Sequence, residues 1–182
     1  MRIEADARIA FPRELVFSTY RDRLPNLVPH LPNVKEIEVL EREDAAKGPG
    51  TTRLLNVWHA QGEIPKVAQT VIKPEMLNWK DYALWNQNDW TCEWRVETKI
   101  FTENVSCKGK NQFIEKDGAT ILQIRGELDI DLRGIRGVPK FLAGTVAPVV
   151  EKFIVGLLTP NLLSVSDGLA KFLEAEAKAQ RG

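Results

Sequence analysis

One stretch of this sequence constrains the fold more than any other, because its side chains alternate in character from Trp90 to Ile100. The even positions are Trp90, Cys92, Trp94, Val96, Thr98 and Ile100, and the odd positions are Thr91, Glu93, Arg95, Glu97 and Lys99. Alternation of this kind predicts a β-strand in a sheet with one buried and one solvated face. The chain must therefore contain a sheet that is covered on one side.

Other segments show the same period of two and predict further strands. They are Arg2–Ala10, Val34–Glu43, Thr51–Gln61, Asn78–Asn86, Asn104–Lys116 and Ala119–Asp131, in addition to Trp90–Phe101. Asp117-Gly118 is a hairpin turn signal between the last two of these segments. Because successive strands are joined by short turns, we expect an antiparallel sheet of about six to seven strands.

The helical signals lie at the two ends of the chain. Phe11-Pro12-Arg13-Glu14 opens a short helix, and a second short helix holds Leu27, Val28 and Leu31. A long helical region runs from Pro139 to about Ala177, where Pro148 and Pro160 are expected to kink or divide it and 174–182 is expected to fray. Its apolar face, spaced by three and four, is Leu142, Val146, Val149, Phe153 and Leu157. The layout predicts an α+β fold: a curved antiparallel sheet around a long C-terminal helix.

The strands 90–101 and 104–116 can be paired by placing inward residues opposite inward residues. The pairing with the shortest sensible turn sets Trp94 opposite Asn111 and Val96 opposite Gly109. Cys92 and Cys107 then lie roughly 20 Å apart at ~3.3 Å per residue, too far for a disulfide. Gly109 and Asn111 on an inward face indicate either a partly polar cavity or a bulge at the glycine.

Composition limits the classes of function. The 182 residues suit one domain, 1–182, and the 25 basic residues match the 25 acidic ones. This balance argues against a nucleic-acid partner, which normally meets a basic excess. We expect no transmembrane segment, because no unbroken apolar run reaches ~18 residues, and no secretory signal. With two free thiols, these features favour a cytoplasmic location.

Few residues have the character of a reactive site. Arg53, Leu55, Val57 and His59 share one strand face, and an inward orientation would place two polar groups in an apolar cavity. The opposite face, with Leu54, Asn56 and Trp58, is nearly as apolar, so the reverse orientation stays open. Two histidines and two distant cysteines form no dense zinc-ligand set, and no Gly-x-Ser-x-Gly motif occurs. The sequence therefore predicts no metal, no cofactor and no assigned catalytic residue.

The segment from Gly62 to Ile72 is more apolar than an ordinary loop. Ile64, Pro65, Val67 and Val71 are candidates for a lid over a pocket, with Pro65 in the first turn of a short helix. The alternative is a small satellite of the hydrophobic core.

The order of strand, two short helices, long meander and C-terminal helix resembles the START-like (SRPBCC) superfamily. The segment Ile9-Ala-Phe-Pro-Arg-Glu-Leu-Val-Phe17 is similar to the N-terminal region of the polyketide cyclase/dehydrase and lipid-transport members of this superfamily. A weaker likeness, carried by Thr52-Arg-Leu-Leu-Asn-Val-Trp58, is to PRELI-type lipid transfer proteins. The resemblance implies a helix-grip fold whose cavity lies between the sheet and the C-terminal helix.

The leading hypothesis is a carrier or binding protein for a hydrophobic small molecule or lipid, with transient membrane contact as a further expectation. The expected ligand-binding residues are Arg53, Leu55, Val57, His59, Trp94, Asn111, Phe113, Leu142, Val146, Val149 and Phe153. The alternative is a polyketide cyclase/aromatase-like enzyme that uses the same cavity, with His59 as a proton-transfer group. A third hypothesis is an interaction module that uses the outer face of the sheet.

Overall fold

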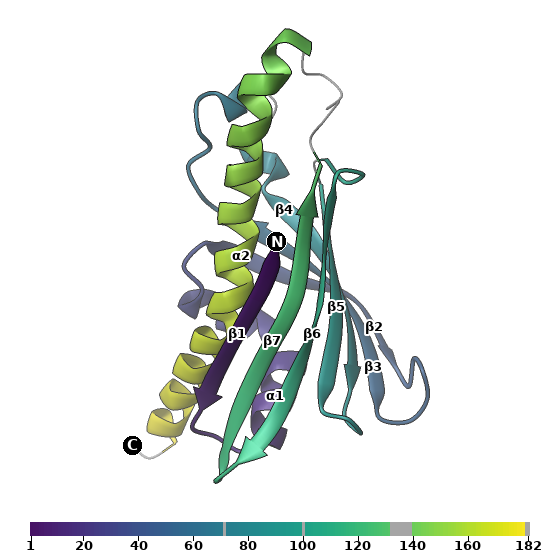
Figure 1. Cartoon of the computed structure of the whole chain (residues 1–182). Helices are drawn as coiled ribbons and strands as arrows, with labels where there is room; N and C mark the ends of the chain where they lie inside the picture. Colours follow the sequence, from purple (N-terminus) through teal and green to yellow (C-terminus); the bar gives the residue numbers. More distant parts are fainter. Residues whose placement is uncertain (71, 100, 132–139, 181–182) are drawn as a thin grey trace.

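The long helix lies along one face of a single antiparallel sheet (Figure 1). This computed structural model describes residues 1–70, 72–99, 101–131 and 140–180. The elements are β1 (Arg2–Ile9), α1 (Arg13–Asp22), η1 (Leu24–His30), β2 (Val34–Asp44), β3 (Thr51–Ala60), η2 (Ala68–Thr70), η3 (Pro74–Met76), β4 (Asn78–Asn86), β5 (Thr91–Thr98), β6 (Val105–Lys116), β7 (Ala119–Ile130) and α2 (Lys140–Ala179). The strand order is β1-β7-β6-β5-β4-β3-β2. The expected α+β helix-grip layout is confirmed.

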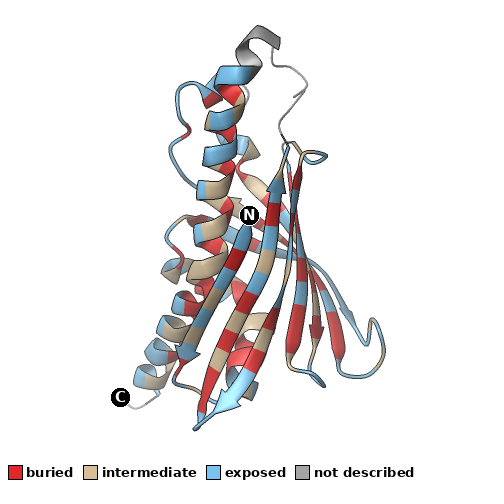
Figure 2. Cartoon of the chain, viewed as in Figure 1, coloured by how far each residue is buried: buried red, intermediate tan, exposed pale blue. Residues whose placement is uncertain are grey.

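Alternation of side chains gives the sheet its covered face. Along β5, Cys92, Trp94 and Val96 are buried while Glu93 and Arg95 are exposed. The same alternation of buried and exposed bands follows the neighbouring strands in Figure 2. The apolar face packs against α2, and the charged face meets solvent, as period-two patterning requires.

Helix α2 buries a stripe that differs by one position from the expected one. The described core residues of α2 are Val146, Val150, Ile154, Leu158, Val165, Leu169 and Leu173. Val149, Phe153 and Leu157 are half-buried at the margin of this stripe, and the side chain of Leu142 lies outside the described residues. The helix is apolar on several sides, so its 3.6-residue period alone did not select the buried stripe.

Helix α2 runs through both internal prolines without a break, so the expected division at Pro148 or Pro160 is wrong. A proline leaves the carbonyl four residues earlier without its helical donor. Those carbonyls belong to Gly144 and Gly156, which are exposed and have nothing within 4 Å of an added Cβ. We infer that water can satisfy them, which lets the helix continue.

The C-terminal stretch that was expected to fray is helical as far as Ala179. Arg23 holds it to the body of the molecule, because its guanidinium donates to both oxygens of Glu176 at 2.5 and 2.6 Å. The same guanidinium lies 4.7 Å from the ring centre of Phe172.

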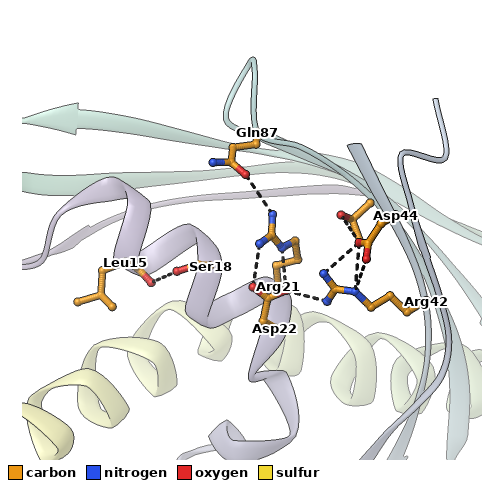
Figure 3. A network of polar contacts seen from close by, with 8 residues as sticks. Leu15, Ser18, Arg21, Asp22, Arg42, Asp44 and Gln87 are labelled. Atoms are coloured by element: carbon orange, nitrogen blue, oxygen red, sulfur yellow. Dashed lines mark hydrogen bonds and ion pairs between the residues drawn. The ribbon is translucent and has the colours of Figure 1, made fainter. Parts of the chain in front are cut away.

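Helix α1 sits over an aromatic cluster and is tied to the sheet at its C-terminal end. Phe17 meets Trp85 and Phe113 edge-on, with ring centres 5.2 and 5.1 Å apart. At the end of α1, Asp22 accepts hydrogen bonds from Arg21 and from Arg42 of β2, each at 2.8 Å (Figure 3). These contacts hold the last turn of α1 in place.

The pairing of β5 with β6 is shifted by two residues from the expected one. Trp94 lies opposite Gly109, and Val96 lies opposite Cys107. The Trp94 indole fills the space that a Cβ at Gly109 would need, and Gly126 of β7 lies opposite Gly109 with its own Cβ position 2.7 Å from the ring. No register shift occurs at Gly109, so the glycine makes room for an aromatic ring and forms no bulge.

By length and composition, Gly144–Ala179 of α2 could cross a membrane, and 28% of its most apolar window is buried. This likeness does not contradict the expectation of no transmembrane segment, which stays a prediction from the sequence. A helix that packs on the sheet of a soluble protein passes the same test, and α2 packs on β1, β7 and η1.

Candidate functional site

The inner face of the sheet, the end of α1 and the middle of α2 enclose a small polar space in an apolar interior. Its walls are largely aromatic and aliphatic: Leu24, Leu54, Trp58, Trp79, Ala83, Trp85, Trp94, Val96, Ile124 and Leu162. Six further residues bring polar or sulfur atoms to it: Tyr20, Asn56, Asp81, Cys92, Asn111 and Asn161. Polar groups placed inside an apolar shell are the features that fix the orientation of a bound molecule.

Asp81 is the ionisable centre of this space. It lies on the inward face of β4 between Trp79 and Ala83, and one of its carboxylate oxygens accepts from Asn56 Nδ2 at 3.1 Å and from Trp58 Nε1 at 3.4 Å. Asp81 keeps some accessible surface although it lies deep in the fold, because it lines the internal space. Burial raises the pKa of Asp81 to about 6, against the lowering effect of the two hydrogen bonds.

A second polar pair lies on the neighbouring strands. The Nε1–H of Trp94 donates to Oδ1 of Asn111 at 2.9 Å, and both residues are buried. The Asn111 side chain also acts to lower the pKa of Tyr20 of α1, which lines the same space. Burial, followed by the neighbouring Cys92 and Asp81, raises the pKa of Tyr20 well above its usual range, so its phenol stays neutral.

Three buried polar atoms at this space have no hydrogen-bond partner among the described residues: Asn56 Oδ1, Trp85 Nε1 and Asn161 Oδ1. Asn161 and Asn56 are each 1% exposed. One N–H of the Asn161 amide donates to the Leu157 carbonyl at 2.8 Å, whereas its oxygen has no partner among the described residues. A buried unpaired polar atom costs about 1–3 kcal/mol, so three around one space indicate that something else completes them.

The space itself is small, with a volume of about 20 Å³. One water molecule needs roughly 10–15 Å³ measured in this way. Four tryptophan side chains line this space, and two of them, Trp58 and Trp79, stack with ring centres 5.8 Å apart. The interior in this conformation therefore accommodates a water or a group of similar size.

The two cysteines are not nucleophiles in this environment. Both are free and buried. Burial, followed by the charge of Asp81, raises the pKa of Cys92 well above its usual range and that of Cys107 to about 12. Both thiols therefore stay protonated at neutral pH.

Strand β3 takes the second of the two orientations that its sequence left open, so the four candidate residues on its other face do not line the internal space. Arg53 points outward and pairs with Glu43, and His59 contacts Glu38 at 2.6 Å on the same outer face, which Leu55 and Val57 share. Leu54, Asn56 and Trp58 point inward instead. Both faces are comparably apolar, and burial of the large Trp58 indole favours the observed orientation.

The remaining candidates fall into four places. Trp94 and Asn111 line the internal space, whereas Phe113 lies in the aromatic cluster beneath α1, and Val146 lies in the α2 core stripe. Val149, Phe153 and Pro65 come together in a separate open groove of about 720 Å³ between α2 and the segment 61–65.

The structure describes three of the four residues expected to form a lid. Ile64 is buried and Val67 is 43% exposed, while Val71 lies outside the described residues. Residues 61–65 have no regular secondary structure, but the Pro65 carbonyl accepts from the backbone N–H groups of Ala68 and Gln69 at 2.8 and 3.1 Å, so Pro65 opens a helical turn. A short 3₁₀ turn, η2, begins only at Ala68.

Sequence reasoning missed Asp81, Asn56, Tyr20 and Asn161 as site residues. The signal for Asp81 was present, because it falls on the same strand face as Trp79, Ala83 and Trp85. A lone carboxylate on an apolar face is a stronger indication of function than an arginine on a strand whose orientation is ambiguous.

One group among the described residues has the chemistry to hold a metal ion. Glu36, Glu38 and His59 offer ligand atoms within 4.8 Å of one another on the outer face of β2 and β3. The sequence did not predict this group, because strand pairing brings His59 beside Glu36. The two glutamates are exposed, and exposed acidic groups of this kind are common in proteins without a bound metal.

Comparisons with known proteins show similarity of structure to solved proteins. No protein-family model and no curated protein matches the sequence. Among solved structures, the protein TTHA0849 from Thermus thermophilus is similar at a TM-score of 0.66 and 21% identity, over 97% of this chain and 99% of that one.

Two further similar structures are those of enzymes. The ZhuI aromatase/cyclase from Streptomyces sp. R1128 is similar at a TM-score of 0.59 and 18% identity, over 98% of this chain and 95% of that one. Norcoclaurine synthase from Thalictrum flavum is similar at a TM-score of 0.58 and 14% identity, over 95% of this chain and 86% of that one. The chain therefore has the START-like helix-grip fold.

Proposed function

We propose that this chain binds a small, largely apolar molecule between the sheet and α2, with the polar end of the ligand at Asp81. The observation that carries this proposal is the set of three unpaired buried polar atoms around the space beside that carboxylate. Natural interiors pair nearly all such atoms, so atoms left open around one space support a role in binding.

The size of the interior favours a small molecule over a lipid. Ligand pockets for drug-sized molecules enclose about 300–1,000 Å³, whereas the space beside Asp81 holds about 20 Å³. Binding therefore requires α2 or its neighbours to move outward, and a smaller ligand needs a smaller displacement. A lipid, membrane contact and a cytoplasmic location remain predictions from the sequence.

The open groove between α2 and residues 61–65 is our candidate for the entrance, which keeps the lid role for Ile64, Pro65, Val67 and Val71. Gly156 lines this groove, and an added side chain there meets nothing within 4 Å. We expect Gly156→Phe to fill the groove and slow ligand association. Gly144→Phe, at an equally open site on α2 that does not line the groove, is the matched control.

A ligand-observed NMR screen of a small-molecule library tests the binding proposal. We expect compounds that bind the wild type and Asp129→Asn, and that lose affinity with Asp81→Asn. Asp129 is an exposed carboxylate on β7, so its variant controls for the loss of one charge. Binding that is identical in all three proteins would contradict the proposal.

A second function, proton-transfer catalysis in the same space, is favoured by one specific observation. A carboxyl whose pKa is about 6 can accept and return a proton near neutral pH, and Asp81 has such a value. The neutral phenol of Tyr20 lines the same space and can donate a hydrogen bond to a developing oxyanion. His59 lies outside this site, so it no longer fills the base role. We expect such turnover to rise with pH through about 6 and to vanish in Asp81→Asn.

A further inference from the structure

The unpaired atoms at the internal space are mostly acceptors. Asn56 and Asn161 each present a free carbonyl oxygen, and the hydrogen bonds from Asn56 and Trp58 to Asp81 both go to one oxygen of its carboxylate. Trp85 Nε1 is the one unpaired donor among the described atoms there. A molecule that brings hydrogen-bond donors can therefore complete the two free amide oxygens and the Asp81 carboxylate.

The partners of the two amides determine which of their ends is free. The amide nitrogen of Asn56 donates to the Asp81 carboxylate, which accepts when ionised. The amide nitrogen of Asn161 donates to the Leu157 carbonyl, which can only accept. Reversing either amide would set two acceptors against each other, so both free ends are oxygens.

The charge of the site also favours a ligand that donates hydrogen bonds. No Lys, Arg or His is among the described residues that line the space, so Asp81 is its one ionised group at neutral pH. Tryptophan rings form several of its walls, including the stacked pair Trp58 and Trp79. Carboxylate and indole faces both attract cations, and tryptophan is the strongest aromatic partner for an ammonium group.

We propose that the ligand carries a protonated amine, which lies between Asp81, Asn56 and Asn161, on a compact aromatic or aliphatic body. This inference rests on the proposed function and names its ligand class. An ammonium group is similar in size to a water, so it matches the space beside Asp81 in this conformation. Carboxylates, phosphates and anionic lipids are excluded by the same groups, because they would meet acceptors and a negative charge.

Isothermal titration with three probes of similar size tests the inference: 2-phenylethylamine, 2-phenylethanol and phenylacetate. We expect the amine to bind the wild type at least about tenfold more tightly than either analogue, the size of one hydrogen bond to a charged group. Asp81→Asn should remove that preference, and Asp129→Asn should keep it. In NMR, the side-chain carboxyl signal of Asp81 should shift only with the amine, which gives a readout that does not depend on a variant.

Each other outcome overturns the inference in a recognisable way. Binding of phenylethanol or phenylacetate as tight as that of the amine would refute the amine class and leave small-molecule binding standing. Equal amine affinity in wild type and Asp81→Asn would place the amine elsewhere. Absence of binding by all three probes would also refute the amine class, and the library screen then decides separately whether the interior binds any small molecule.

Discussion

At the scale of single residues, the carboxylate of Asp81 destabilises the fold at neutral pH. Its pKa is raised to about 6 from an ordinary value of 3.8. Between these values the folded chain holds a proton that the unfolded chain has released, so this contribution to stability declines as pH rises through about 6. The cost at neutral pH is of the order of 3 kcal/mol, at 1.36 kcal/mol per pH unit. Groups kept at such a cost are typical of functional sites.

We therefore expect Asp81→Asn to stabilise the protein by about 1–2 kcal/mol at pH 7.5, because the amide oxygen still accepts from Asn56 and Trp58 without a buried charge. The gain should shrink towards pH 4, where the wild-type carboxyl is protonated. Urea unfolding of both proteins across this pH range measures the difference. Equal stability at pH 7.5 would mean that Asp81 is not a costly buried charge.

Gly109 gives a second prediction for a single residue, because its lack of a side chain makes room for the Trp94 ring. A Cβ there would collide with the indole of Trp94 and with the backbone carbonyl of Arg125. We expect Gly109→Ala to destabilise the protein by about 1–3 kcal/mol, the usual cost of overpacking. Gly62→Ala, where an added Cβ meets nothing within 4 Å, is the control in the same thermal unfolding assay. Similar small effects of both variants would show that the sheet relaxes freely.

At the scale of elements, the sequence predicted the strands and helices closely. The expected strand 78–86 matches β4 at both ends, and the hairpin at Asp117-Gly118 lies between β6 and β7 as expected. The orientation of β3 was harder to predict from the sequence. Both of its faces are apolar, and a period of two does not show which face is buried. The one-position error in the α2 stripe has the same origin.

The attachment of α1 gives a prediction at this scale. Burial tends to raise the pKa of Asp22, but hydrogen bonds from Arg21 and Arg42 outweigh it and hold that pKa below 3.8. Stabilisation by a lowered carboxyl pKa is present above the unfolded value and is lost as pH falls through the folded value. We expect Asp22→Asn to cost about 0.5–1 kcal/mol at pH 7 after solvent screening, and less below pH 3.

Chemical denaturation at both pH values checks this prediction. Asp167→Asn, at an exposed carboxylate on α2 away from the network, is the control. A pH-independent effect of Asp22→Asn would indicate that the ion pairs do not hold the last turn of α1. Tyr20 lies in that turn, so the variant should also loosen one wall of the internal space.

At the scale of the whole molecule, the topology follows from the order of elements, whereas the site does not. A meander of antiparallel strands followed by a long apolar helix has few compact solutions, and the helix-grip fold is one of them. The site depends on which residues of β3, β4, α1 and α2 meet, and these are far apart in sequence. Trp94 and Asn111 were identified because they lie on adjacent strands, while Asp81 and Asn161 required the three-dimensional structure.

Native mass spectrometry of the wild type and Asp81→Asn, after incubation with a small-molecule extract, tests the central claim most directly. We expect a one-to-one adduct of low mass on the wild type. We also expect that the adduct is strongly reduced on Asp81→Asn, although that variant is folded and at least as stable. An adduct of equal abundance on both proteins, or none on the wild type, would contradict a ligand site at Asp81.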